Sequence, residues 1–162
     1  MSIWLWILLW TKLIREYKQG AEIMSKILIV YVTITGNTEK MAQAIEKGAK
    51  SSGSDVTCKT VGETSVNELP GYDVIAFGSP AMGAEVIEEA EMEPFFTNAA
   101  AHLKGKRVAL FGSYDWGDGE WLRTWEERCK NAGADVTGTL KAHLEPDDEA
   151  LAECESFGAK LK

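Results

Sequence analysis

The residues best suited to bind a ligand form one short run, Thr33-Ile34-Thr35-Gly36-Asn37-Thr38, which follows an apolar segment and opens a segment with helical spacing. The run offers hydroxyl groups, and the first backbone N–H groups of a helix have no partner within that helix. Hydroxyls and free N–H groups together favour a phosphate monoester. The run lacks the Gly-Lys-Ser/Thr of nucleoside triphosphatases and the GxGxxG of dinucleotide-binding proteins. An ordinary capped turn between a strand and a helix is the alternative.

Two further loops carry apolar side chains that could cover a flat ligand. In residues 78–85 (Gly-Ser-Pro-Ala-Met-Gly-Ala-Glu), Met82 is apolar and flexible, and Gly83 permits backbone conformations closed to other residues. In residues 113–121, Trp116 stands among Gly and Asp residues that are typical of exposed turns. Taken singly, Met82 could be a core residue and Trp116 could pack back on the core. Together with the run at 33–38, the two loops predict a mononucleotide with a large flat ring.

Apolar runs alternate with segments of helical spacing, and these elements must position the three loops. The apolar runs predict strands at 26–32, 55–61, 72–78, 106–112 and 135–140, of which 55–61 is more polar and nearer an edge. Apolar residues at helical spacing predict helices at 39–51, 92–103, 120–132 and 147–162. The alternation predicts an α/β fold, a single doubly wound domain whose five-stranded parallel sheet has helices on both faces. Ligands of such folds bind at the carboxyl ends of the strands, where the first, third and fourth strands lead into the three loops.

The composition narrows the class of protein. The chain has 162 residues, enough for one domain with a sizeable core, and a net charge of -8. Residues 1–23 carry +1, which leaves -9 on residues 24–162, and this acidity disfavours nucleic acid and anionic lipid. The three cysteines are far apart and the two histidines have no neighbouring cysteine, so we expect neither a disulfide framework nor a metal site. Reduced thiols are typical of the cytoplasm.

The first 23 residues differ from the rest of the chain. Residues 3–10 (Ile-Trp-Leu-Trp-Ile-Leu-Leu-Trp) are wholly apolar, but a membrane-spanning helix needs about 20 apolar residues, and Thr11 and Lys12 interrupt the run. The segment also lacks the leading positive charge and the small-residue cleavage site of a secretory signal. Met24 directly precedes the first strand, as a natural N-terminus would. We therefore expect residues 1–23 to be an extension outside the domain at 24–162, arising from a misplaced start site or from cloning. An interfacial anchor is the alternative.

Three motifs in the chain resemble those of the flavodoxin family, in its short-chain, clostridial-type class. Residues 33–39 (Thr-x-Thr-Gly-Asn-Thr-Glu) resemble its phosphate signature, and residues 78–83 and 111–119 resemble the two loops that flank the flavin. The resemblance covers about residues 24–162, and the direct passage from the last strand into the last helix is similar to the short-chain class. It implies the strand order 2-1-3-4-5 and FMN, bound non-covalently, as the cofactor.

The resemblance also implies a role for each loop. Residues 33–38 would hold the FMN phosphate, Met82 would cover the inner face of the isoalloxazine ring and Trp116 its outer face. Glu85 would contact the N3 edge of the flavin, and Ser113 would lie near the phosphate and the ribityl chain. The cofactor-binding residues implied in this way are Thr33, Ile34, Thr35, Gly36, Asn37, Thr38, Ser79, Pro80, Ala81, Met82, Gly83, Glu85, Ser113, Tyr114, Asp115, Trp116, Gly117 and Asp118.

We expect a low-potential carrier of single electrons between redox enzymes, a cytoplasmic flavoprotein with no catalytic residue. Fully reduced FMN is an anion, and nearby carboxylates disfavour it. The same acidic rim would attract reductases and oxidoreductases with basic docking faces. We also expect a monomer that binds no nucleic acid and contacts a membrane only, if at all, through its N-terminal segment. The carboxylates expected on the rim are Glu85, Glu88, Glu89, Glu91, Asp115, Asp118 and Glu120.

Three other functions compete with this interpretation. An NAD(P)H:quinone reductase of flavodoxin-like fold is the first alternative, but Trp116 would block one face of the flavin that its substrate needs. A signalling receiver domain would need acidic residues after the first strand, where Thr33 stands. The third is an interaction module without FMN, attached to a membrane through residues 3–10.

Overall fold

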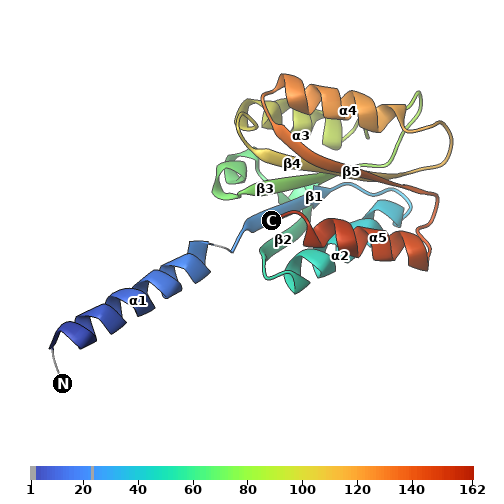
Figure 1. The fold of residues 1–162 in the computed structure, drawn as a ribbon. Coiled ribbons are helices and arrows are strands. Elements are labelled where there is room, and N and C mark those ends of the chain that lie inside the picture. Colours follow the sequence, from blue (N-terminus) through green and yellow to red (C-terminus); the bar gives the residue numbers. More distant parts are fainter. Residues whose placement is uncertain (1–2, 23) are drawn as a thin grey trace.

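The computed structural model describes residues 3–22 and 24–162, without the side chains of residues 19–22. Five parallel strands form one sheet in the order β2-β1-β3-β4-β5 (Figure 1). The strands are β1 (Lys26–Tyr31), β2 (Asp55–Thr60), β3 (Val74–Gly78), β4 (Arg107–Tyr114) and β5 (Asp135–His143). The helices are α1 (Ile3–Glu22), α2 (Asn37–Ser51), α3 (Met92–Ala99), α4 (Glu120–Asn131) and α5 (Asp148–Ala159). The predicted fold class and strand order are confirmed.

The three central strands, β1, β3 and β4, are buried on both faces. β1 reads Lys-Ile-Leu-Ile-Val-Tyr and β3 reads Val-Ile-Ala-Phe-Gly, continuous apolar runs that suit strands covered by helices on both sides. Ile27 of β1 pairs with Val74 of β3, which in turn pairs with Arg107 of β4. β2 and β5 form the edges and are more exposed, as the polar composition of β2 predicts. The central strands therefore set the points from which the three predicted ligand-binding loops leave the sheet.

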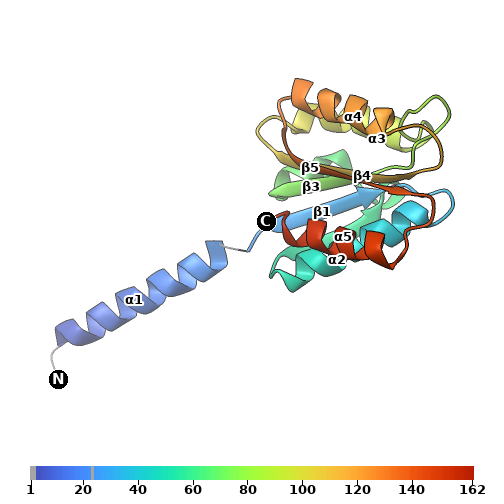
Figure 2. The same cartoon turned by 45° about the vertical axis from the view of Figure 1, so that its right-hand side comes forward.

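α2 and α5 cover one face of the sheet, and α3 and α4 cover the other (Figure 2). α2 and α5 pack so closely that each carries a glycine at the contact. A Cβ atom added at Gly158 would lie 2.0 Å from the Ile45 carbonyl oxygen, and one added at Gly48 would lie 1.8 Å from the Glu155 carbonyl oxygen. Side chains at these two positions would force the helices apart.

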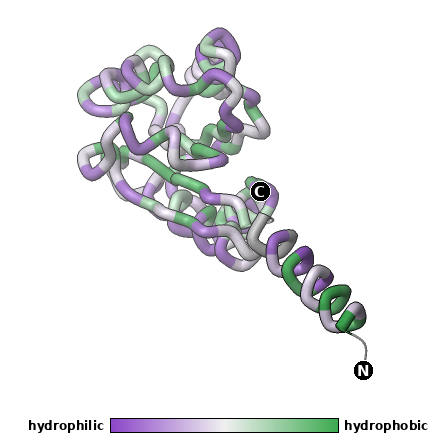
Figure 3. Tube along the Cα trace, turned by 90° about the vertical axis from the view of Figure 1, so that its left-hand side faces the viewer, coloured by the Kyte–Doolittle hydropathy of each residue, from purple (hydrophilic) through white to green (hydrophobic). Residues whose placement is uncertain are grey.

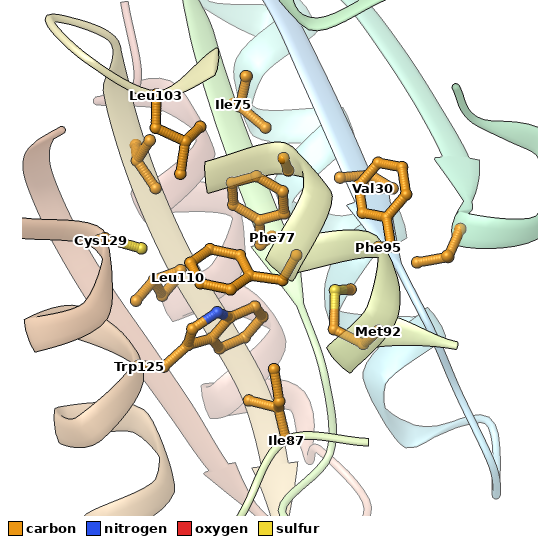
Figure 4. Close-up of a cluster of buried hydrophobic side chains, with 14 of the residues drawn as sticks. Val30, Ile75, Phe77, Ile87, Met92, Phe95, Leu103, Leu110, Trp125 and Cys129 are labelled. Carbon is orange, nitrogen blue, oxygen red and sulfur yellow. The ribbon is translucent and has the colours of Figure 1, made fainter. Parts of the chain in front are cut away.

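Aromatic side chains fill the core beneath α3 and α4 (Figure 4). The ring of Phe77 on β3 meets that of Phe96 on α3 edge to face, with 5.5 Å between the ring centroids. Phe96 meets Trp125 of α4 in the same way at 5.7 Å. Edge-to-face pairs contribute about 0.5–1.5 kcal/mol each beyond the burial of their area. This cluster fixes α3 and α4, and with them the loops that precede both helices.

Several elements end at residues other than those predicted. β4 and β5 continue to Tyr114 and His143, because the two strands stay paired up to those residues. The helix predicted at 92–103 ends at Ala99 and continues as a 3-10 turn at Ala100–His102. The stretch between β2 and β3 forms two short 3-10 helices, at 61–63 and 66–71, each with a capping box at its start.

The three cysteines lie in the described part of the chain and are free thiols. Burial raises the pKa of Cys58 and of Cys129 to about 12, and that of Cys154 to about 11. Because the thiolate is the reactive form, these raised pKa values favour the less reactive thiol form near neutral pH.

α1 projects away from the sheet and the helices that cover it (Figures 1 and 3). Its first half is apolar, whereas Lys12, Arg15 and Lys18 lie in its second half. Within residues 3–22 and 24–162, no helix is both long and apolar enough to cross a bilayer. The same described residues hold no group of three or more His, Cys, Asp or Glu side chains suited to a metal ion.

Candidate functional site

The loop between β1 and α2 contains the hydroxyl-rich run 33–38. The chain turns at Gly36, which directly precedes α2 with a φ of 91°, a left-handed conformation that favours glycine. The Gly36 N–H donates a hydrogen bond to the Thr33 hydroxyl oxygen at 3.1 Å, so the Thr33 side chain holds the turn in place. Ile34 and Thr35 are exposed on the outside of the loop. The N-terminus of α2 thus lies beside hydroxyl side chains, an arrangement that suits an anion.

Thr38 and Ser113 connect this loop to the end of β4. Their hydroxyl oxygens lie 3.0 Å apart, and both residues are buried. The Ser113 carbonyl oxygen accepts a hydrogen bond from the Ala81 N–H at 2.9 Å, which attaches the loop after β3 to the same point. Ser113 therefore contacts both of the other predicted loops.

The loop after β3 folds back on itself around Gly83. The Met82 N–H donates to the Val86 carbonyl at 2.8 Å, and the Val86 N–H donates to the Met82 carbonyl at 3.0 Å. Gly83 and Glu85 have positive φ angles of 46° and 52°. Positive φ is uncommon for a residue with a side chain, and such strain is concentrated at functional sites. The tight turn holds Met82 at one end and presents the Glu85 carboxylate from its other end.

The Glu85 carboxylate spans the gap to the loop that follows β4. Its Oε1 atom accepts hydrogen bonds from the Gly119 N–H and the Glu120 N–H, both at 3.2 Å, at the N-terminus of α4. Gly117 has a φ of 86°, and a Cβ atom added there would lie 2.2 Å from the same Oε1. A negative charge at this helix end is favourable because the helix dipole is positive there. Glu85 and Gly117 thereby fix the two loops against each other.

A narrow cleft separates the loop after β3 from the loop after β4. It has a volume of about 10 Å³, roughly the space for one water molecule. Met82 and Trp116, the two residues predicted to cover opposite faces of a flat ring, both line this cleft. A ring placed between them must move their side chains apart. The residues that line the cleft are Ala81, Met82, Gly83, Glu85, Asp115 and Trp116.

Glu88 was predicted as one of the exposed carboxylates of the acidic rim, but this prediction is wrong because Glu88 is buried. Its carboxylate accepts hydrogen bonds from the backbone N–H groups of Ala90, Glu91 and Met92 at 2.7, 2.8 and 3.0 Å. Burial alone would raise the pKa of Glu88, but these three hydrogen bonds outweigh it and hold the pKa below its ordinary value of 4.5. Glu88 therefore shapes the start of α3 and does not face the cleft loops as a free charge.

Asp118 differs from the other rim carboxylates because it has a cationic partner. Arg123 Nη2 donates to Asp118 Oδ1 at 2.8 Å and lowers the pKa of that carboxyl group. Lys141 Nζ also donates to the Asp118 carbonyl oxygen at 2.6 Å. Part of the negative charge predicted for this loop is thus balanced locally.

The structure brings the three predicted loops together at the C-terminal ends of the strands. Tyr114, however, lies within the sheet and not in the loop that follows β4. Tyr114 is the last residue of β4, and its ring packs against Trp121 at 5.6 Å and His143 at 5.1 Å between centroids. Sequence reasoning missed His143, whose Nε2 atom lies 2.8 Å from the Asp115 carbonyl oxygen. No sequence pattern indicated this contact, because β5 extends alongside β4 beyond its apolar run and only this extension brings His143 opposite Tyr114.

Comparison with protein families and curated proteins gives consistent matches. A family model described as Flavodoxin matches residues 29–158. The flavodoxin of Megasphaera elsdenii is 47% identical over 130 residues, which cover 80% of this chain and 93% of that protein. The flavodoxin of Clostridium beijerinckii is 47% identical over 133 residues, which cover 82% of this chain and 96% of that protein.

Solved structures agree with the sequence matches. The solution structure of two-electron reduced Megasphaera elsdenii flavodoxin superposes with a TM-score of 0.77 and covers 82% of this chain and 96% of its own. The structure of a flavodoxin from the domain Archaea is 31% identical, also has a TM-score of 0.77, and covers 84% of this chain and 95% of its own. Both alignments therefore span nearly the whole of the solved chains.

Proposed function

The chain belongs to the flavodoxin family, and on that premise we propose that it carries electrons at low potential, with the FMN phosphate at residues 33–38 and the flavin ring between Met82 and Trp116. Family membership makes the chain an FMN-binding electron carrier and not an enzyme. The quinone reductase alternative is not favoured, because the relatives at 47% identity are flavodoxins. FMN supplies the redox chemistry when bound, and the residues of the chain bind and orient it.

The donors around α2 support the phosphate assignment. The Thr33 hydroxyl is held by the Gly36 N–H and the Thr38 hydroxyl by Ser113, so both side chains are ordered by the fold itself. Ordered donors lose little conformational entropy when a ligand arrives, which favours tight binding. The N-terminus of α2 adds backbone N–H groups and the positive end of the helix dipole. This donor set fits a phosphate monoester such as that of FMN.

The cleft shared by Met82 and Trp116 is the single observation on which the ring assignment rests. The Trp116 side chain has an exposed fraction of 61%, which is costly for the largest apolar side chain unless a ligand covers it. A flat ring stacked on Trp116 would cover one face of the indole, and the flexible Met82 side chain would adapt to the other face of the ring.

Glu85 has the capacity to bind the flavin as well as α4. An ionised carboxylate offers about four acceptor positions, and two are used by the Gly119 and Glu120 N–H groups. We assign a remaining position to the N3–H edge of the flavin, as the family resemblance implies. Because Glu85 is fixed by its contacts with the loop after β4, that hydrogen bond would orient the ring within the cleft.

The remaining acidic rim supports a low potential and basic partners. Reduction adds negative charge, which Glu85 and Asp115 at the cleft would oppose, whereas Asp118 would contribute less because it is paired with Arg123. We infer that the partner proteins present basic faces and that their encounters weaken as salt increases. The monomeric state and the cytoplasmic location remain predictions.

Titration of the apoprotein with FMN and with riboflavin tests the assignment. Riboflavin has the same ring and ribityl chain but no phosphate. Hydrogen bonds to a charged group contribute about 1.5–3 kcal/mol each, so FMN is expected to bind at least roughly 100-fold more tightly. Quenching of flavin fluorescence measures both affinities. Equal affinities would refute the phosphate site at residues 33–38, and no quenching by either flavin would refute the whole site.

A further inference from the structure

α1 exposes large apolar side chains along most of its length. The exposed fraction is 76% for Ile3, 53% for Leu5, 66% for Leu8 and 64% for Trp10. Figure 3 shows the most hydrophobic turns of α1 at the end farthest from the domain. Contiguous apolar patches of this size are rare on soluble monomers, and they mark surfaces that bind lipid or protein.

The apolar side chains are distributed unevenly along α1. Residues 3–10 are all apolar and cover more than two helical turns, so they place apolar groups on every side of the helix. In the following turns, Lys12 and Arg15 share one side, and Leu13 and Tyr17 lie on the other. A helix that is apolar all round is buried in protein or in lipid, whereas a helix with a charged face lies at a boundary with water. α1 changes from the first kind to the second near its middle.

We propose that α1 anchors the protein to a lipid bilayer, with residues 3–10 within the hydrocarbon of one leaflet. Eight helical residues extend about 12 Å, and one leaflet contributes about half of the roughly 30 Å hydrocarbon layer. The segment therefore reaches into one leaflet without crossing the bilayer. Lys12, Arg15 and Lys18 follow at the depth of the headgroups, and α1 as a whole has an excess of one positive charge, because Glu16 and Glu22 oppose these three.

A second copy of the chain is the other occupant to consider, because one side of α1 is grooved. Pairing of two helices would fill that groove but would cover only this side. Leu5 and Leu8 lie on the opposite side and would stay exposed to water. Lipid covers both sides at once, so the exposed residues favour the bilayer. The residues that line the groove are Ile3, Trp6, Ile7, Trp10, Thr11 and Ile14.

Such an anchor is compatible with electron transfer. α1 precedes β1 at the end of the sheet where the strands begin. The three loops assigned to FMN lie at the other end, where the strands finish (Figure 1). The residues from 24 onward carry a net charge of -9, which anionic headgroups repel, so contact with the bilayer is confined to α1. The loops around Met82 and Trp116 thus stay open to redox partners.

Flotation of the FMN-loaded full chain with vesicles tests the anchor. The probes are vesicles of phosphatidylcholine alone and of phosphatidylcholine with about one-third phosphatidylglycerol. The chain is expected to float with both kinds of vesicle, and high salt should leave this binding largely intact, because the apolar residues 3–10 carry it. In the double variant Leu5→Ser/Leu8→Ser, the partition coefficient should fall by roughly tenfold or more. Leu144→Ser is the matched control, since it removes an exposed apolar side chain from the domain, and it should float as the parent does.

Two results would overturn the anchor. One is that the full chain floats with neither kind of vesicle, and the other is that Leu5→Ser/Leu8→Ser floats as well as the parent. Analytical sedimentation without lipid tests the other occupant, a second copy of the chain paired through α1. In that case the chain would associate with itself, Ile7→Ser would abolish the association and Leu5→Ser/Leu8→Ser would preserve it. Absorbance of bound FMN in each fraction shows separately whether the flavin site is intact.

Discussion

The hydroxyl oxygens of Thr38 and Ser113 lie 3.0 Å apart in a buried contact, which joins the first turn of α2 to the C-terminal end of β4. Through it, the loop assigned to the phosphate is joined to the strand that leads to Trp116. The backbone of Ser113 also accepts from the Ala81 N–H, beside Met82. The separation of the three loops that we assign to FMN is therefore set by hydrogen bonds within the protein.

Thr38→Val tests this contact, because it leaves the buried Ser113 hydroxyl without the Thr38 oxygen. We expect the free energy of unfolding of the apoprotein to fall by about 1–3 kcal/mol and the FMN affinity to fall roughly tenfold. Chemical denaturation and flavin titration measure the two effects. Thr97→Val is the control, since the Thr97 hydroxyl bonds to Glu93 at the surface, and it should cost no more than about 0.5 kcal/mol. Fully additive losses in Thr38→Val/Ser113→Ala would contradict a direct contact.

Replacement of Trp116 tests the outer wall of the cleft. Trp116→Ala removes the stacking surface, and we expect FMN to bind roughly tenfold to 100-fold more weakly. Trp116→Phe keeps an aromatic face and should recover most of the affinity. Because Trp116 is mostly exposed in the described structure, the stability of the apoprotein should change little in both variants. An unchanged FMN affinity in Trp116→Ala would place the ring elsewhere.

Two glycine substitutions separate backbone strain from the contact between Glu85 and Gly117. Gly53 and Gly117 have nearly equal positive φ angles, 89° and 86°, but a Cβ atom meets nothing within 4 Å at Gly53 and meets Glu85 at Gly117. Gly53→Ala should therefore cost only the strain of about 1–2 kcal/mol. Gly117→Ala should cost more and should also weaken FMN binding. Equal losses of unfolding free energy in the two variants would show that the loops adjust without cost.

The pKa of Glu88 predicts how one buried carboxylate affects stability with pH. Three backbone hydrogen bonds hold this pKa below 4.5 in the folded state. The stabilisation is therefore present above the unfolded-state value and is lost as the pH falls through the folded-state value. We expect Glu88→Gln to lower the free energy of unfolding by about 1–3 kcal/mol near neutral pH, and this difference should shrink in acid. Glu89→Gln, at an exposed neighbour, should change little, and a pH-independent effect of Glu88→Gln would contradict the argument.

Asp115→Asn tests whether the acidic rim lowers the potential of the bound flavin. Removal of a negative charge beside the cleft makes it easier to add an electron to the bound flavin. The potential of the second one-electron step, which produces the fully reduced anion, should therefore rise. Two charges about 4 Å apart interact by roughly 1 kcal/mol in water, which corresponds to about 40 mV for one electron. Asp135→Asn removes the same charge at the N-terminal end of β5, whereas the cleft lies at the C-terminal ends of the strands. This control should leave the potential unchanged. Anaerobic spectroelectrochemistry measures the potentials, and equal shifts in both variants would indicate a general charge effect.

The sheet and the three loops could be predicted because their signals are local. The apolar run Lys26–Tyr31 predicts a strand covered on both faces, and Gly36 together with three threonines marks a turn before a helix. Each signal lies within a few residues of the feature that it predicts. Each of the three loops directly follows a strand. Because all strands of a parallel sheet end on the same side, the loops must lie together there.

Two of the features that sequence reasoning missed depend on contacts between residues far apart in the sequence, and the third, the cap at Glu88, depends on the local fold of its own loop. Glu88 is an ordinary acidic residue in the sequence, and only the fold of the loop before α3 turns it into a buried cap. His143 reaches Asp115 because β5 runs alongside β4 for longer than its apolar run predicts. The contact between Glu85 and Gly117 likewise joins two loops whose spacing in the sequence carries no signal.

A crystal structure of the FMN complex tests the central claim most directly. The account predicts the flavin ring between the Met82 and Trp116 side chains, with carbon atoms within about 4 Å of both. It also predicts the phosphate within hydrogen-bond distance of the loop at residues 33–38 and of the first N–H groups of α2. A ring bound outside this cleft, or a phosphate held away from residues 33–38, would contradict it.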